Sequence, residues 1–154
     1  MKPNKQIRRV YQPRERPTDF LKYWRVVRMW VQSKHGVGVP DLELMLYLYS
    51  AGLFTKKEFN EFEFTLNWDK KRFGRLRKEG WINQWREATT RQKALYELSF
   101  KGKKLIRSVY KKLLGEETIS ESGNHNPIFK DSATYSQKRV RPLIAKLNSE
   151  TTCR

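Results

Sequence analysis

The sequence is poor in the residues that staple small proteins or build metal sites. Only one of its 154 residues is a cysteine, Cys153, so we expect neither a disulfide nor a zinc cluster, and a lone thiol fits a reducing compartment. His35 and His125 stand alone, with no cysteine or carboxylate at ligand spacing, so no metal site is expected. No apolar run approaches the length of a membrane span, and MKPNKQIRRVYQPRERP lacks the apolar core of a signal peptide. We therefore expect a soluble, cytoplasmic protein.

Motifs that carry catalysis are also missing. The sequence contains no Gly-rich phosphate loop, no nucleophile elbow and no deaminase signature. Its one acidic cluster, Glu58, Glu61 and Glu63, is expected to keep a helix soluble and away from DNA rather than to perform acid–base chemistry. We therefore expect no catalytic residues, no cofactor and no enzymatic activity.

Acidic residues are scarce, and this scarcity is the most informative feature of the composition. Lys and Arg total 33 against 16 Asp and Glu, which gives a net charge of +17. The excess is uneven, because residues 68–115 hold 15 basic against 4 acidic side chains, a net of +11. A balance of this kind indicates a polyanionic partner, since an opposite charge relieves the repulsion.

Periodicity and caps divide the chain into elements. Residues 1–17 hold three prolines among six basic residues and predict a mobile basic arm. Helices are expected from about Asp19 to Gly36, from Pro40 to Gly52 as the central core helix, and from a Thr55–Glu58 capping box. FEFTLN reads as a turn or an extended link, and Asn67 as the cap of a helix that runs from Trp68 to Glu79 and stops at Gly80.

The hydrophobic period changes after Gly80. WINQWRE and ALYELS alternate as two strands of a β-hairpin whose basic tip carries Arg91 and Lys93. Ser99 is expected to cap a helix over 100–115. Residues 116–134 read as a polar linker, and a last helix is expected over 135–148, bent by Pro142 or beginning there.

The stretch WDKKRFGRLRKEGW, residues 68–81, contains six of the basic residues. On a helix, Phe73 and Leu76 supply one packing face, and the opposite face shows Lys70, Lys71, Gly74, Arg75 and Lys78. A solvated helix face usually alternates charge sign, but here only Asp69 and Glu79 are acidic. Gly74 costs about 1 kcal/mol in a helix relative to Ala, and on an exposed face it allows close approach of another backbone. The pattern favours a nucleic-acid surface over a plain solvated face.

The order of the elements carries more weight than any one residue. A short helix, a link, a basic helix, a Gly stop, a hairpin and a helix follow one another as in a winged helix-turn-helix, in which the second short helix enters the major groove. From about Asp19 to Glu116 the chain resembles MarR-type winged-helix DNA-binding proteins. The resemblance rests on LELMLYLYSAGLFTKKEF, on FGRLRKEGWI and on ALYELSFKGKKLIRSVYKKLLGE.

The resemblance implies a mainly α fold with a small β-hairpin wing and a duplex DNA partner. It matches Lys71 and Arg75 to basic positions of the recognition helix, and Arg91 to the wing arginine. It also implies a homodimer in which the first helix and the 135–154 segment interlock with a partner chain, and it leaves the existence of a small-molecule effector unknown. Residues 18–115 would then form the DNA-binding domain.

These observations predict a protein that binds double-stranded DNA. The expected contacts are made by the basic helix, the wing and the arm: Asn67, Lys70, Lys71, Gly74, Arg75, Lys78, Arg91, Lys93, Arg8, Arg9, Arg14 and Arg16. A dimeric MarR-like transcriptional regulator is the first interpretation. The alternatives are a sequence-tolerant DNA-coating or architectural protein, of a cellular nucleoid or a virion, and a winged-helix adaptor that binds an acidic protein.

Overall fold

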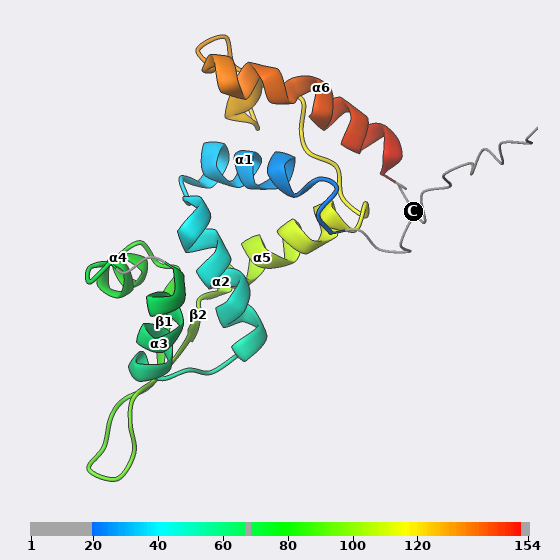
Figure 1. Cartoon of the computed structure of the whole chain (residues 1–154). Helices are drawn as coiled ribbons and strands as arrows, with labels where there is room; N and C mark the ends of the chain where they lie inside the picture. The colour runs from blue at the N-terminus through cyan, green and yellow to red at the C-terminus, as the bar shows by residue number, and fades with distance from the viewer. Residues whose placement is uncertain (1–19, 67–68, 152–154) are drawn as a thin grey trace, which may run out of the picture.

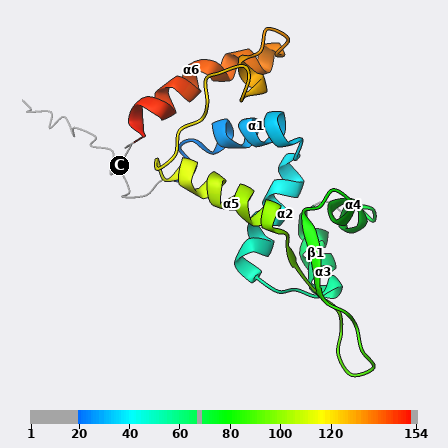
Figure 2. The same ribbon diagram turned by 180° about the vertical axis from the view of Figure 1, so that it is seen from behind.

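The computed structural model describes residues 20–66 and 69–151. Within these ranges the chain is mainly helical, with one small antiparallel hairpin (Figures 1 and 2). The elements are α1 (Trp24–His35), α2 (Val39–Ala51), α3 (Lys56–Leu66), α4 (Arg72–Lys78), β1 (Ile82–Arg86), β2 (Leu95–Leu98), α5 (Phe100–Leu113), the 3-10 helix η1 (Pro127–Phe129) and α6 (Tyr135–Glu150). This arrangement is compatible with a winged helix. Over the described ranges, no helix combines the length and the apolar character that crossing a membrane requires.

Helix α2 lies at the centre of the molecule, as its sequence predicts. Leu42, Leu44, Met45 and Leu48 are buried, and α2 contacts α1, α3, α5 and β2. Pro40 lies in the first turn of α2. A backbone N–H at this position has no acceptor within the helix, so its absence in proline breaks no helical hydrogen bond. An apolar helix of this kind must be covered on several sides, and the other elements are therefore arranged around it.

Helix α3 opens with the predicted capping box. The Thr55 hydroxyl oxygen accepts from the Glu58 N–H at 3.2 Å, and the Glu58 carboxylate accepts from the Thr55 N–H at 3.0 Å. The expectation of a link over FEFTLN is wrong, because α3 continues to Leu66. Phe62 explains the extension, since its ring stacks on Tyr47 of α2 with centroids 3.5 Å apart.

The hairpin forms where alternation predicts it. Ile82 pairs with Leu98 and Gln84 with Tyr96, and a register shift between Gln84 and Arg86 marks a bulge. Phe54, in the link between α2 and α3, adds a bridge to the outer side of β2, with Phe54 and Tyr96 exchanging backbone hydrogen bonds of 3.0 and 2.8 Å. The chain between α2 and α3 therefore runs beside the hairpin like a short third strand.

Helix α5 has the predicted cap, since the Ser99 hydroxyl accepts from the Gly102 N–H at 3.1 Å. Gly102 suits this position, because a Cβ atom would stand 3.0 Å from the backbone oxygen of Trp81, closer than an ordinary van der Waals contact. The helix therefore starts tightly against the first residue after Gly80.

Helices α1 and α6 pack antiparallel, at the end of the molecule away from the hairpin (Figure 1). The Tyr23 hydroxyl donates to Glu150 at one end of the pair, and the Gln137 side chain donates to Ser33 at 3.0 Å at the other. The apolar stripe of α6 is buried within the chain through Val140, Ile144 and Leu147, while Leu143 is exposed.

One predicted helix start is wrong and another is confirmed. Helix α1 begins at Trp24 rather than near Asp19, which lies outside the described residues, because residues 20–23 form a turn closed by the Trp24 N–H and the Leu21 carbonyl. Helix α6 begins at Tyr135, as the predicted range 135–148 has it, and Pro142 does not set the start, because Thr134 and Gln137 form a capping box ahead of the proline.

Candidate nucleic-acid interface

Helix α4 is shorter than its sequence predicts and has two chemically different faces. It covers Arg72–Lys78, and the preceding turn is held by Asp69, whose carboxylate accepts from the Lys71 N–H at 2.9 Å. Phe73 and Leu76 are buried, as expected. Gly80 ends the segment with φ +82°, a left-handed conformation that glycine adopts without strain.

Phe73 anchors α4 in an aromatic cluster. Its ring meets Phe59 of α3 edge-on with centroids 5.0 Å apart, and Tyr96 of β2 in the same manner at 5.0 Å. Phe54 extends the cluster, because it contacts both Phe59 and Tyr96. These rings join α3, α4 and the hairpin into one unit, and the position of α4 relative to the wing is therefore fixed by packing.

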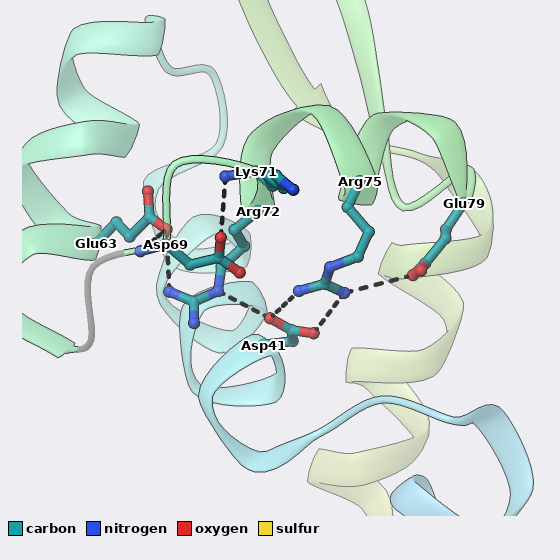
Figure 3. Close-up of polar contacts among 7 residues, drawn as sticks. All are labelled: Asp41, Glu63, Asp69, Lys71, Arg72, Arg75 and Glu79. Atoms are coloured by element: carbon teal, nitrogen blue, oxygen red, sulfur yellow. Dashed lines mark hydrogen bonds and ion pairs between the residues drawn. The ribbon is translucent and has the colours of Figure 1, made fainter.

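The second anchor of α4 is a set of ion pairs that we call the arginine–carboxylate network (Figure 3). Arg72, only 4% exposed, donates to Asp41 of α2 at 2.9 Å and to Glu63 of α3 at 3.0 Å. Arg75 donates to both oxygens of Asp41, at 2.9 and 3.0 Å. Each carboxylate is itself buried, at 8% exposure for Asp41 and 2% for Glu63. The network ties α4 to two other helices at once.

Helical spacing places Arg75 on the exposed face of α4, but its guanidinium is paired with Asp41 of α2. Its guanidinium makes a bidentate contact with Asp41, and its side chain is 38% exposed. Hydrogen bonding to Asp41 raises the pKa of Arg75, because the carboxylate stabilises the charged guanidinium. The expectation for Glu63 is also wrong, since its buried carboxylate pairs with Arg72 and does not solubilise the helix surface.

The opposite side of α4 agrees with the sequence. Lys70, Lys71, Gly74 and Lys78 are exposed, and we call these four residues the lysine face. A Cβ atom on Gly74 would meet nothing within 4 Å, so the backbone there is open to another molecule. Beside Lys70, an open groove of about 890 Å³ lies along α3 and is lined by Lys56, Lys57, Asn60, Glu61, Glu63 and Phe64.

The loop between β1 and β2, which the sequence predicts as the wing, presents both of its predicted cations to solvent. Arg91 and Lys93 are exposed in the loop between β1 and β2, which extends away from the helices (Figure 2). The loop is braced internally, because the Thr89 hydroxyl accepts from the Gln92 N–H at 3.1 Å and Arg86 donates to the Lys93 carbonyl at 3.1 Å. These two hydrogen bonds join the two sides of the loop.

Several residues of this surface were missed by sequence reasoning. Arg77 is exposed and lies over the Tyr96 ring at 5.2 Å, between α4 and the hairpin. Trp85 is 54% exposed and lies at the bulge of β1. The irregular register there interrupts the alternation of buried and exposed side chains, so the sequence pattern does not predict which side of the strand Trp85 occupies. Asn67 and the arm residues Arg8, Arg9, Arg14 and Arg16 lie outside the described residues.

The structure thus brings the lysine face and the wing onto one unit formed by α3, α4 and the hairpin, distant from α6 (Figure 1). No family model, no curated protein and no solved structure matches the chain. Inferences about function therefore depend on the residues themselves.

Proposed function

We propose that this chain is a winged-helix protein that binds double-stranded DNA. The order α2, the Phe54 bridge, α3, α4, β1 and β2 supports the proposal, because a winged helix-turn-helix places its elements in this sequence. In this arrangement α4 is the helix that approaches the major groove, and the loop with Arg91 and Lys93 meets the flanking backbone.

One observation carries the proposal. Helix α4 is held from behind by the arginine–carboxylate network and by Phe73, while its lysine face, open at Gly74, points to solvent. A rigid helix with ammonium groups around an exposed glycine suits the close approach of a sugar-phosphate chain. The net charge of +11 over residues 68–115 supplies long-range attraction to the same partner.

Salt dependence tests the proposal. If a dimer neutralises roughly 6 to 10 phosphates, the affinity for duplex DNA falls by about 10³–10⁵ between roughly 50 and 200 mM salt. Fluorescence anisotropy of a labelled duplex over this range is the measurement. A flat salt response would remove the electrostatic basis of the proposal and would favour the adaptor that binds an acidic protein.

The pairing of Arg75 favours a second candidate, a sequence-tolerant DNA-coating protein. Arg is the side chain that most often reads guanine, through both of its terminal nitrogens. In Arg75 these nitrogens are bound to Asp41, which leaves the lysine face to grip phosphate. The two candidates differ in the ratio of specific to non-specific affinity, and a ratio of about 10³ or more after selection from a random duplex pool identifies a regulator. The homodimer and the MarR-like regulatory role stay predictions.

A further inference from the structure

A cavity of about 560 Å³ lies away from the lysine face, between the C-terminal half of α1, the residue after Gly80 and the length of α5. Trp30, Trp81 and Leu105 contribute apolar walls, and Phe100, 76% exposed, stands at the rim. Its volume is in the range of sites that hold small molecules. The cavity shares no residue with the lysine face or the wing.

The walls of the cavity carry ammonium groups held over indole rings. The Lys101 Nζ lies 3.9 Å from the centre of the Trp81 ring and donates to the Glu79 carbonyl at 3.2 Å. The Lys112 Nζ lies 4.1 Å from the centre of the Trp30 ring. Cation–π contacts of this kind fix the positions of the charges without neutralising them.

The positive charge of the cavity exceeds its negative charge. Lys34, Lys101, Lys104 and Lys112 line it, against the single carboxylate of Glu117. Glu117 lies 3.1 Å from the buried Lys112, which also donates to Ser108 at 2.8 Å. Across residues 20–66 and 69–151, no ion pair joins Lys34, Lys101 or Lys104 to a carboxylate, although all three are exposed.

The like charges act on one another across the cavity. Burial and then the charges of Lys34, Lys101 and Lys112 lower the pKa of His35, whose ring packs edge-on against Trp30. Burial lowers the pKa of Lys112 as well, and Lys34 lowers it further, against the opposite effect of Glu117. Stored repulsion of this kind is relieved when an anion enters.

We infer that this cavity, through Lys34, Lys101 and Lys104, binds the phosphate group of a small phosphorylated molecule. A phosphate monoester carries about −1.5 to −2 charges at neutral pH and three acceptor oxygens, which suits three ammonium donors. A single carboxylate offers only one charge and two oxygens, so it matches the three lysines less well in both charge and number of acceptors. Phe100 at the rim offers a ring face to the organic part of the ligand. This assignment does not depend on the binding of DNA.

The test uses the full chain and three phosphate probes: ATP, pyrophosphate and tripolyphosphate, without magnesium and at about 150 mM salt, where surface charges are screened. Calorimetry measures the stoichiometry, and the fluorescence of Trp30 and Trp81 in the cavity wall reports its occupation. We expect saturable binding of one molecule per chain, and none of the uncharged adenosine. The variant Lys34→Ala/Lys104→Ala should weaken binding by about tenfold or more, as expected for the loss of charge-assisted hydrogen bonds.

The matched control is Lys138→Ala/Lys146→Ala, which removes the same charge from exposed positions of α6. It should leave the affinity for the probes unchanged within about twofold, because neither lysine lines the cavity and exposed charges are screened at this salt concentration. An equal loss in both variants, or no saturable binding, would overturn the assignment in favour of general surface charge. Tighter binding of benzoate than of pyrophosphate would reject phosphate as the ligand group. If the small probes fail to bind while duplex DNA binding alone depends on Lys34 and Lys104, the lysines belong to a nucleic-acid surface instead.

Discussion

The two faces of α4 use the same kind of charge for different purposes. Towards α2 and α3, Arg72 and Arg75 are paired with Asp41 and Glu63 and hold the helix in place. Towards solvent, the lysine face leaves its ammonium groups exposed. Helix α4 and the turn before it thus combine an internal ionic anchor with an external cationic surface.

The division follows the chemistry of the two side chains. A guanidinium is planar, remains protonated and makes two parallel hydrogen bonds to one carboxylate, which suits it to buried pairs. An ammonium on a flexible stem is strongly hydrated and suits a solvent-facing contact with phosphate. A count of basic residues therefore overstates the charge that a partner meets at α4, because two of the cations are already compensated by carboxylates.

The largest effect is expected on the anchoring side. Arg72→Met should lower the free energy of unfolding by about 3–5 kcal/mol, because it leaves the buried Glu63 carboxylate without its cation. Asp41 keeps its contact with Arg75, so the loss is assigned mainly to Glu63. Chemical denaturation with urea measures the change.

A second substitution sharpens this prediction. Arg72→Met/Glu63→Leu should recover most of the lost stability, since an apolar pair avoids the cost of burying charge. Lys71→Ala, on the exposed side, should change the free energy of unfolding by no more than about 0.5 kcal/mol. A small effect of Arg72→Met alone would mean that the network contributes little to the position of α4.

An intermediate effect is expected at Arg75, whose side chain is partly exposed. Arg75→Ala should lower the free energy of unfolding by about 1–2 kcal/mol, less than a fully buried charged hydrogen bond because solvent screens the pair. The ratio of affinities for selected and random duplexes should stay constant. Thermal unfolding and anisotropy on both duplexes are the measurements. Loss of affinity on preferred sites alone, at unchanged stability, would instead establish Arg75 as a base reader.

The elements that the sequence predicted well depend on local interactions. The caps at Thr55 and Ser99, the stop at Gly80 and the alternation of the two strands involve residues a few positions apart, and each is found in the structure. The end of α3 was missed because it depends on the stacking of Phe62 on Tyr47, which lies in another helix. The helix propensity of a segment does not take account of a contact with another helix.

The candidate site was also predicted only where local pattern decides the position of a residue. Helical spacing identified Phe73, Leu76 and the lysine face, because these follow from period alone. It could not assign Arg75, since the partner Asp41 is 34 positions earlier and is brought close only by the fold. One signal was available: Asp41 is an acidic residue in a mostly apolar helical segment, which suggests a buried partner of opposite charge.

The smallest effects should separate binding from stability on the lysine face. Lys71→Ala should weaken binding to all duplexes about equally and reduce the salt slope by about 1, as the loss of one phosphate contact does. Gly74→Leu should leave the fold intact and stabilise the helix by up to about 1 kcal/mol, since Leu is the better helix former and an added Cβ atom meets nothing within 4 Å.

The same Gly74→Leu side chain would stand between the helix and an approaching backbone, so DNA affinity should fall while thermal stability holds or rises. Lys138→Ala on α6 removes one charge far from α4 and serves as the control, with a smaller effect on affinity. Unchanged affinity for both Lys71→Ala and Gly74→Leu would show that this face does not touch DNA. Helix α4 would then have an ionic anchor on one face and an ordinary solvated surface on the other.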